Sequence, residues 1–523
     1  MSFSGKSSPP AVSGGQAGSH ATVVGGQGKR FVHRFSPLVV PWPVLLVAGL
    51  MVVVLLALSG AYGFHRDEMY FIVAGRHPAF GYPDQPLLTP LLSAASVALF
   101  GLSPTAIRVL PALAMGFVVI LTALMARDLG GSRRAQLLAA VTVALSGYLA
   151  AGHLDATATY ELLFGALILR LLVKLLADGD RRLWLAVGVT AGIGLQNKDT
   201  LLLLCGGLVA GLVLARRWDV LRSSWAWAAA AIALLVWAPN LAWQATHGWP
   251  QLTMAHVIAG DAAANRAQLL PILWLFTGPL LFALTITGWA WMLRARAAAP
   301  WRAIPFAAVV VLVLVVVSGG KGYYAVGIAP PFMAAGALLL DRWLARGRRR
   351  LRAVTFIAAA ALSGGLVALL TLPVLPVATF ASTSLPSSVP TSAEQIGWPQ
   401  LVTQVQQVVA TLPAQQRAHA VILTNNYGEA AALELLGRGL PPVYSGHNGF
   451  WYWGPPPTGR TVVVHVGDWT PADWSPYFVG CRTVAHIDNG LGINNQEQGQ
   501  AISVCKGLRE PWAAIWPKLR QLS

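Results

Sequence analysis

The fold of this 523-residue chain is decided by LVVPWPVLLVAGLMVVVLLALSG, residues 38–60, and HRDEMYFIVAGRHPAFGYPDQPLLTPLL, residues 65–92. The first segment has no charged side chain and is long enough to cross a lipid bilayer. The second opens with charged residues and leads into two apolar pieces, at 69–80 and 87–100, that are too short to cross. We therefore expect a transmembrane helix, followed by a long outer loop with two interfacial helices.

The composition indicates an integral membrane protein. Hydrophobic residues make up 55% of the chain and charged residues 11%, whereas soluble domains carry about 25% charged residues. A formal charge of +17 would suggest nucleic acid binding in a soluble protein, but arginines collect in the cytoplasmic loops of membrane proteins. The three cysteines exclude a disulfide scaffold and a Cys-rich metal cluster. We expect the bilayer as a partner, and no nucleic acid.

Further apolar stretches recur along the chain between short polar turns. Together with the first stretch, they predict about eleven transmembrane helices. They lie at 105–127, 135–151, 157–177, 183–196, 200–215, 225–244, 269–293, 303–318, 324–344 and 353–377.

Every second loop between these stretches is basic, which predicts that those loops face the cytoplasm. Lys29, Arg30 and Arg34 precede the first helix, so we expect the N-terminus inside, and an odd number of spans then puts the C-terminus outside. The loop arginines are Arg127, Arg133, Arg134, Arg181, Arg182, Arg216, Arg217, Arg222, Arg294, Arg296, Arg302, Arg342, Arg346, Arg348, Arg349, Arg350 and Arg352.

Composition also divides the chain into four parts. Residues 1–37 are rich in Gly, Ser and Ala and predict a disordered cytoplasmic tail. Residues 38–377 form the predicted transmembrane domain. A linker rich in Ser and Pro follows at 378–395, and residues 396–523 predict a small extracytoplasmic domain.

The last part has the pattern of an α/β domain, because short β-rich runs alternate with a helical pattern. Cys481 and Cys505 both fall in it, and the sequence leaves open whether they pair in an oxidising compartment. The expected strands and helix lie at 421–424, 461–466, 481–487 and 428–436.

The segment 65–92 resembles the first outer loop of the protein O-mannosyltransferase superfamily, which comprises glycosyltransferase family 39 and relatives with the GT-C fold. The transferase that puts aminoarabinose on lipid A belongs to this group. An Asp-Glu pair just after the first span, the interfacial helices and an Asp-X-Pro-Leu stretch carry the resemblance. Later segments are similar to family segments in the expected order: HLDATATYELLF from His153, GLQNKDTLLLL from Gly194, NLAWQATHGWPQL from Asn240 and GGKGYYAVGIAPPF from Gly319. TNNYGEAAALELLG and PPVYSGHNGFWYWGPP resemble a bacterial subgroup with an extracytoplasmic tail.

The resemblance implies an α-helical polytopic membrane protein with the GT-C fold. It also implies an inverting glycosyltransferase at the outer face of the cytoplasmic membrane. The donor would be a polyprenyl-phosphate sugar, and the acceptor a hydroxyl of a protein, lipid or cell-envelope glycan.

The resemblance further assigns roles to three acids. Asp67 matches the family's catalytic base, Glu68 orients the site or holds the fold, and Asp155 is a second acidic residue that positions substrate or, in some members, a metal. These scattered carboxylates define no metal site. A divalent cation is left open as a cofactor, and no other cofactor is expected.

Lys198 and Lys321 break the positive-inside pattern, because each lies at the outer end of a helix, where a lipid phosphate would arrive. Gln85 stands where the lipid A transferase has a lysine implicated in phosphate binding, which shifts that contact to these two lysines. The candidates for binding the lipid phosphate are Arg66, Lys198, Lys321, Tyr323 and Tyr324. Weaker candidates for contact with sugar or acceptor are Asp84, Gln85, His247, His447 and Trp451.

Each assignment has a structural alternative. The acid pair can start an interfacial helix as N-terminal charge, Asp155 can cap the helix that follows it, and the lysines can snorkel to the interface. Packing of the tail against the membrane part also explains the aromatic cluster around Trp451.

Two other functions compete with the transferase. One is a transporter or lipid flippase, which would need ionisable residues near the middle of the bilayer and paired, interrupted helices. Neither feature is visible. The other is a noncatalytic scaffold with a glycan-binding tail, which would tolerate Asp67→Asn.

Overall fold

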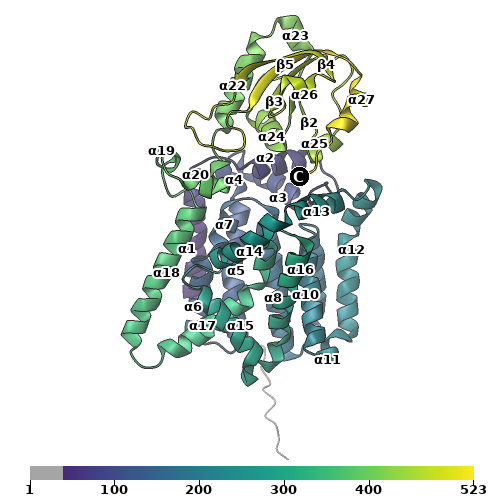
Figure 1. Ribbon diagram of the computed structural model, residues 1–523. Helices are drawn as coiled ribbons and strands as arrows, with labels where there is room; N and C mark the ends of the chain where they lie inside the picture. Colours follow the sequence, from purple (N-terminus) through teal and green to yellow (C-terminus); the bar gives the residue numbers. More distant parts are fainter. Residues whose placement is uncertain (1–38) are drawn as a thin grey trace, which may run out of the picture. The chain divides into compact units, whose positions relative to one another are not determined.

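The computed structural model describes residues 39–523, in which a bundle of helices carries a small β-sheet at one end (Figure 1). Residues 40–523 pack as one compact unit. The predicted tail over 1–37, and with it the basic residues before the first helix, lies outside the described residues.

The segment that follows the first apolar helix has the two predicted helices. Helix α1 (Trp42–Leu58) is followed by α2 (Arg66–Arg76) and α3 (Leu88–Phe100). Helix α2 begins at His65, whose side chain accepts from the backbone N–H of Asp67, while Glu68 reaches back to the His65 N–H. Such a reciprocal cap fixes where a helix starts. Here it sets the direction of the charged residues in its first turn.

Most of the described chain is helical, and part of the bundle is long and apolar enough to cross a membrane. The spans that qualify by length and composition are Pro104–Asp128 (α4 and α5), Ser224–Thr246 (α12) and Arg349–Thr371 (α18), with a fourth if η2 (Gly322–Ile328) and α17 (Pro330–Leu344), bent by 53°, count as one. The chain is therefore a membrane protein, and the predicted number of eleven spans stays a prediction. The other helices of the bundle are α6 (Arg133–Ala144), α7 (Tyr148–His153), α8 (Thr157–Asp178), α9 (Leu183–Leu195), α10 (Leu201–Leu214), α11 (Trp218–Leu221), α13 (Pro250–Gly260), α14 (Ala262–Phe276), α15 (Phe282–Arg294) and α16 (Ala303–Ser318).

Besides the predicted span 324–344, which the bend between η2 and α17 interrupts, two further predicted spans are broken in the structure. The expected helix over 269–293 is wrong, because α14 ends at Phe276 and α15 begins at Phe282. Gly278 lies between them with a φ of 84°, a left-handed conformation that no helix continues through. The stretch 135–151 likewise divides into α6 and α7.

Close helix contacts depend on small residues. A Cβ on Gly288 of α15 would lie 2.0 Å from the backbone oxygen of Phe332 on α17, and one on Gly336 would lie 2.2 Å from that of Leu284. Only glycine lets the two helices approach this closely.

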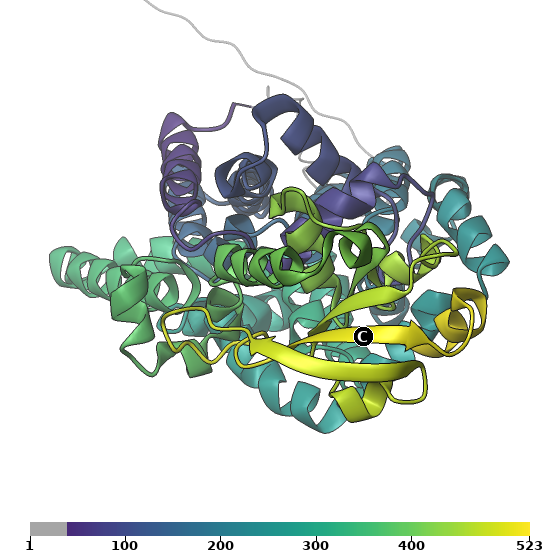
Figure 2. The same cartoon turned by 90° about the horizontal axis from the view of Figure 1, so that it is seen from above.

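The C-terminal sheet has the strand order β2-β1-β3-β5-β4. Strand β1 pairs in parallel with β2 and β3, and β5 is antiparallel to both β3 and β4. The predicted strands and helix are present, whereas β2, β5 and α22 were not predicted. The elements are α22 (Trp398–Thr411), β1 (Ala420–Thr424), α24 (Tyr427–Leu436), β2 (Val443–Ser445), β3 (Val462–Gly467), β4 (Phe478–His486) and β5 (Ala501–Leu508). The sheet lies across the end of the helical bundle (Figure 2).

Cys481 and Cys505 form a disulfide between the paired strands β4 and β5. The predicted linker at 378–395 contains three short helices, α19 (Val377–Ala381), α20 (Leu385–Ser388) and α21 (Pro390–Ala393).

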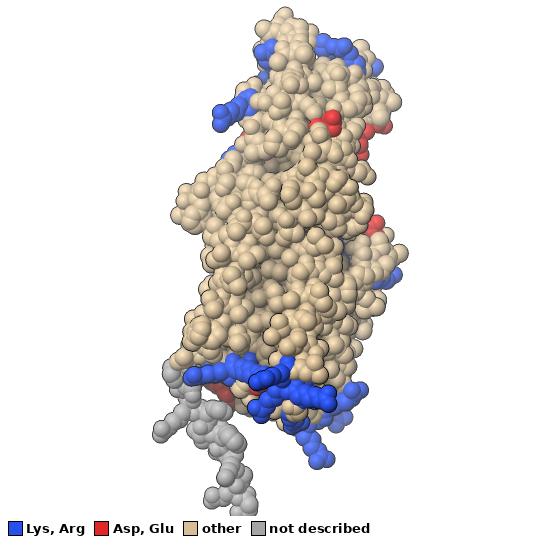
Figure 3. Space-filling model, turned by 90° about the vertical axis from the view of Figure 1, so that its left-hand side faces the viewer, with Lys and Arg blue, Asp and Glu red and all other residues tan. Residues whose placement is uncertain are grey.

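Charge is distributed unevenly along the bundle. On the face in Figure 3, basic side chains gather at the end away from the sheet, and a broad band above them is almost free of charged side chains. The alternating basic loops of the sequence therefore meet at one end of the molecule.

Candidate active site

Asp67 lies in the first turn of α2 and remains partly accessible, with 37% of its side chain exposed. Its Oδ1 accepts a hydrogen bond from the Tyr427 hydroxyl at 2.7 Å and lies 3.8 Å from Arg66 Nε, while its Oδ2 lies 3.8 Å from His65 Nδ1. Burial opposes ionisation, but His65, Arg66, the Tyr427 hydroxyl and the charge of Lys321 together lower the pKa of Asp67. The carboxylate is therefore ionised and ready to accept a proton.

Glu68, the next residue, is fully buried. Arg108 donates to both of its oxygens, at 2.8 Å to Oε1 and 2.7 Å to Oε2, and the backbone N–H groups of His65 and Asp155 donate as well. Arg108 also donates to the backbone oxygens of Ser59 and Gly63. These contacts leave Glu68 no free oxygen for a substrate, and they favour the alternative in which it holds the fold.

Asp155 is also buried, at 1% exposed. Ser93 donates to Oδ2 at 2.5 Å and Tyr160 donates to Oδ1 at 2.7 Å. Burial raises the pKa of Asp155 to about 7, even though both hydroxyls oppose this shift. Helix α8 begins after Ala156 without a side-chain cap, so Asp155 does not cap it. Instead, its hydrogen bonds to Ser93 and Tyr160 connect α3 to α8 next to Glu68.

Lys198 lies beside Tyr323 and Tyr324, which are predicted to bind the lipid phosphate together with it. Its Nζ is 3.4 Å from Glu161 Oε2 and 3.3 Å from the Tyr323 hydroxyl, and it lies over the rings of both Tyr323 and Tyr324, at 4.6 and 5.0 Å from their centroids. Thr200 donates to the other oxygen of Glu161 at 2.6 Å. The structure thus unites three predicted residues around an acid that was not predicted.

Lys321 is exposed, and within residues 39–523 its ammonium makes no hydrogen bond or ion pair. Partial loss of water and the charge of Lys198 lower its pKa, while Asp67 raises it. The ammonium of Lys321 is therefore an open cation within the electrostatic reach of Asp67, Arg66 and Lys198.

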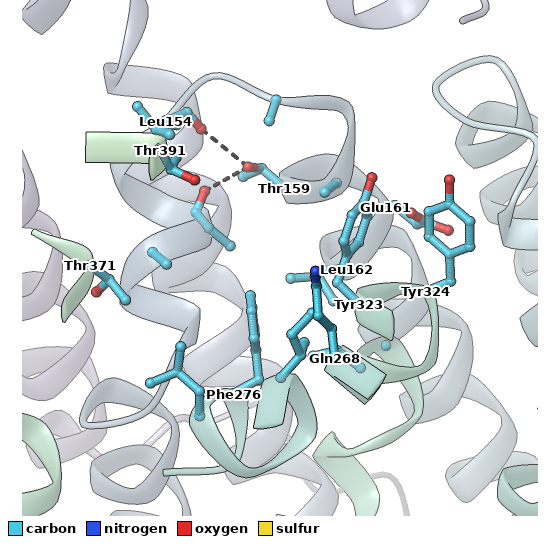
Figure 4. Close-up of a pocket in the computed structure, with 18 of the residues that line it drawn as sticks. Leu154, Thr159, Glu161, Leu162, Gln268, Phe276, Tyr323, Tyr324, Thr371 and Thr391 are labelled. Carbon is cyan, nitrogen blue, oxygen red and sulfur yellow. Dashed lines mark hydrogen bonds between the residues drawn. The ribbon is translucent and has the colours of Figure 1, made fainter. Parts of the chain in front are cut away.

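An apolar cavity of about 510 Å³ is lined by Glu161 and Tyr323, the residues that Lys198 contacts. Glu161, Tyr323 and Tyr324 line one side of it, next to Lys198, and Phe276 lies across from them (Figure 4). Most of the lining residues are aliphatic, among them Leu162, Leu201, Leu204, Ile272, Leu275 and Val311. The cavity therefore offers apolar surface next to a cation.

The C-terminal segment that carries the sheet contacts the site directly. Tyr427, the first residue of α24, bonds Asp67, and the Arg66 guanidinium bonds Gln496. His447 is 7% exposed, its ring lies 4.9 Å from that of Tyr427, and its Nε2 lies 2.7 Å from Ser523 Oγ. Burial and the charge of Arg66 lower the pKa of His447 to about 4, so its ring is neutral.

The weaker candidates are dispersed. Asp84 accepts from the Tyr70 hydroxyl at 2.9 Å, and burial raises the pKa of Asp84 to about 7. Gln85 is buried at 2% exposed. His247 stacks on Trp243 with ring centroids 4.1 Å apart. Trp451 donates to the backbone oxygen of Trp516, so it is held inside the C-terminal domain.

The aromatic cluster of the tail packs on the membrane part. Trp453 stacks on His77 at 4.3 Å, and Tyr452 lies 5.8 Å from Trp243 of α12. The packing alternative therefore accounts for these two side chains.

Sequence reasoning missed three residues of the site: Arg108, Glu161 and Tyr427. The first two carry charges inside apolar stretches, and an ionisable residue in such a place is by itself a functional signal. Tyr427 had no comparable signal.

The described residues contain no group of three or more His, Cys, Asp and Glu side chains that could hold a metal ion. The carboxylates nearest the site are occupied by Arg108, Ser93 and Tyr160. Within residues 39–523, this donor set therefore does not fit a divalent cation.

Comparison with known proteins supports the resemblance. The family model described as dolichyl-phosphate-mannose-protein mannosyltransferase matches residues 84–243. No curated protein matches the sequence.

Solved structures share the fold over most of the chain. ArnT from Cupriavidus metallidurans bound to undecaprenyl phosphate aligns with a TM-score of 0.59 at 14% identity, covering 88% of this chain and 97% of ArnT. The apo state of the same protein aligns with a TM-score of 0.55 at 14% identity and the same coverage. The arabinofuranosyltransferase AftD from Mycobacteria aligns with a TM-score of 0.50 at 14% identity, covering 91% of this chain and 40% of AftD. The predicted resemblance to the GT-C glycosyltransferases is confirmed.

Proposed function

We propose that this chain, a membrane protein with the GT-C fold, transfers a sugar from a polyprenyl phosphate to a hydroxyl group at the outer face of the cytoplasmic membrane. The observation that carries the proposal is the apolar cavity beside Lys198, with the open carboxylate of Asp67 and the open cation Lys321 close by. One end of this arrangement suits an isoprenoid chain, and the other suits a phosphate and a reacting hydroxyl.

In the proposed reaction, Lys198 and Lys321 hold the donor phosphate, and Tyr323 and Tyr324 supply hydroxyls beside it. The acceptor oxygen attacks the anomeric carbon while its proton passes to Asp67. The bond from the anomeric carbon to the phosphate oxygen breaks, and its electron pair leaves with the polyprenyl phosphate. The lysines stabilise the charge that develops there. A single displacement of this kind inverts the anomeric carbon.

Two features support the orientation. The basic loops lie at the end away from the sheet (Figure 3), which fits a cytoplasmic end. The Cys481–Cys505 disulfide fits an oxidising compartment for the C-terminal domain. We therefore propose that Asp67 and the C-terminal domain lie outside the cytoplasm.

The rival functions fit these observations less well. A transporter needs ionisable groups near the middle of the bilayer, whereas the Asp67, Lys198 and Lys321 group lies at the end of the bundle that carries the sheet. A scaffold gives no reason for an ionised, accessible carboxylate next to an unpaired lysine.

The test is to incubate the purified protein with a panel of polyprenyl-phosphate sugars and a membrane extract as the source of acceptors. Release of free polyprenyl phosphate is followed by mass spectrometry. We expect release by the wild type with one class of donor, and a loss of about 10²–10⁴-fold in Asp67→Asn. Equal release by both proteins would remove Asp67 from the chemistry. No release by a folded wild type with any donor would reject the transferase.

A further inference from the structure

Tyr427 is 360 residues from Asp67 in the sequence, yet its hydroxyl donates a 2.7 Å hydrogen bond to Asp67 Oδ1. The contact joins the C-terminal domain to the acid that we propose as the base. No local pattern in the sequence demands this tyrosine, because the first turn of α24 is capped by Asn426 and Glu429 without it.

The position of Tyr427 is fixed from several sides. Its ring lies 4.9 Å from Tyr70 and 4.9 Å from His447, and the Arg66 guanidinium lies 5.8 Å from its centroid. Burial and the charge of Asp67 raise the pKa of Tyr427 well above its ordinary value. The phenol therefore keeps its proton and acts as the donor in this bond.

The bond leaves the two oxygens of Asp67 in different states. Oδ1 is held by Tyr427 and has Arg66 Nε at 3.8 Å, whereas the ion-pair contact of Oδ2 within residues 39–523 is His65 Nδ1, also at 3.8 Å. A carboxylate held by one oxygen presents the other in a fixed direction.

We propose that Tyr427 is a positioning residue of the active site. It holds Asp67 by Oδ1 so that Oδ2 faces the acceptor hydroxyl. The C-terminal domain therefore contributes a residue to the catalytic centre. The inference rests on the proposed transferase function. The acceptor proton then goes to Oδ2, while Tyr427 keeps its own proton.

Several charged and titratable groups face Asp67 and must be considered together. His65 and Arg66 come from its own helix, Lys321 from the loop before η2, and Tyr427 from the C-terminal domain. Asp84 feels the charge of Asp67 from the first outer loop, as does Tyr323 from η2. Of these groups, Tyr427 is the hydrogen-bond donor to a carboxylate oxygen of Asp67, so removing its hydroxyl removes a hydrogen bond that Asp67 accepts.

The test compares Tyr427→Phe with Tyr477→Phe in the full-length protein. The first variant removes the hydroxyl and keeps the ring. The second is a matched control from the same domain, because within residues 39–523 the Tyr477 hydroxyl makes no hydrogen bond. Folding of both variants is checked by their melting temperatures.

Two readouts are measured. The first is the pH dependence of Asp67 modification by a water-soluble carbodiimide, followed on its peptide by mass spectrometry. The second is donor kinetics over the same pH range. We expect Tyr427→Phe to move the Asp67 midpoint to higher pH and to lower kcat roughly tenfold with little change in the donor KM. Tyr477→Phe should change neither.

The outcomes separate the two proposals. An unchanged midpoint and an unchanged kcat in a folded Tyr427→Phe protein would overturn the positioning role and leave the transferase standing. A shifted midpoint in a protein whose wild type transfers no sugar would keep the contact and reject the transferase. Equal losses of kcat in the two phenylalanine variants would make the effect a general disturbance of the domain, which also overturns the positioning role.

Discussion

Two neighbouring acids of α2 have opposite surroundings. Glu68 and Arg108 form a closed pair, 0% and 1% exposed at their side chains, in which both acceptor oxygens are bonded. Asp67 and Lys321 form an open pair, within electrostatic reach of each other but without an ion pair between them. One turn of helix thus carries a structural acid and an accessible acid side by side.

The difference shows that the two acids of an Asp-Glu motif can have separate roles: Glu68 holds the fold, and Asp67 stays accessible. The closed pair ties α2 to the helix that begins after Arg108 and, through the backbone of Asp155, to α8. These contacts fix the helical turn that also carries Asp67. A catalytic group is held accurately only when its supporting contacts are themselves fixed.

The largest expected effect comes from breaking the closed pair. Glu68→Gln leaves Arg108 as a buried charge without its anionic partner, and we expect a loss of about 3–5 kcal/mol of stability. Thermal unfolding in detergent, followed by tryptophan fluorescence, measures this loss. Asp67→Asn is the matched control from the next residue and should keep the wild-type melting temperature. Equal melting temperatures of the two variants would contradict the division into closed and open pairs.

A smaller effect should come from the pH dependence of Asp155, which belongs to the closed side. Its folded pKa of about 7 lies above the unfolded value of about 3.9, so the folded state binds more protons between these values. The contribution of Asp155 to stability is therefore greatest below about pH 4, decreases as the pH rises towards 7 and is then constant, a change of a few kcal/mol. Melting curves from pH 4 to 8 should lose this slope in Asp155→Asn. An identical slope in the variant would show that the carboxyl is not buried as described.

The smallest effect should come from the open pair. Lys321→Met removes a cation without a partner, so we expect an unchanged melting temperature and a donor KM roughly tenfold higher, as for the loss of one charge-assisted contact. Lys198→Met is the comparison, because it leaves Glu161 unpaired and should lower both activity and stability. A lower melting temperature in Lys321→Met would mean that this lysine has a structural partner.

Much of the fold followed from periodicity and composition. The helices at 66–76 and 88–100 and the strands near 421 and 462 agree with their patterns, because local apolar spacing sets local structure. The break at Gly278 was missed although Gly278 and Pro279 form a Gly-Pro pair, which is typical of turns; the long apolar stretch around the pair hid this signal. The strands β2 and β5 were missed because β2 has three residues and β5 depends on partners far along the chain.

The site was predictable only where a residue broke a pattern. Lys198 and Lys321 were singled out because they are cations on the side with few arginines, and Asp67 because it follows the first span in the segment that carries the family resemblance. The different environments of Asp67 and Glu68 could not be predicted, since Arg108 lies 40 residues away. Tyr427 could not be predicted for the same reason, because its partner Asp67 lies 360 residues away in the sequence.

The disulfide has a consequence for handling the protein. Strand β4 is at the edge of the sheet, and most of its residues are exposed. An unprotected edge strand is a template for pairing with other chains, and the Cys481–Cys505 bond clamps β4 to its neighbour. Reducing agents in a purification buffer would therefore break this bond and free an edge strand that can pair with other chains. We expect the protein to aggregate before its helices unfold.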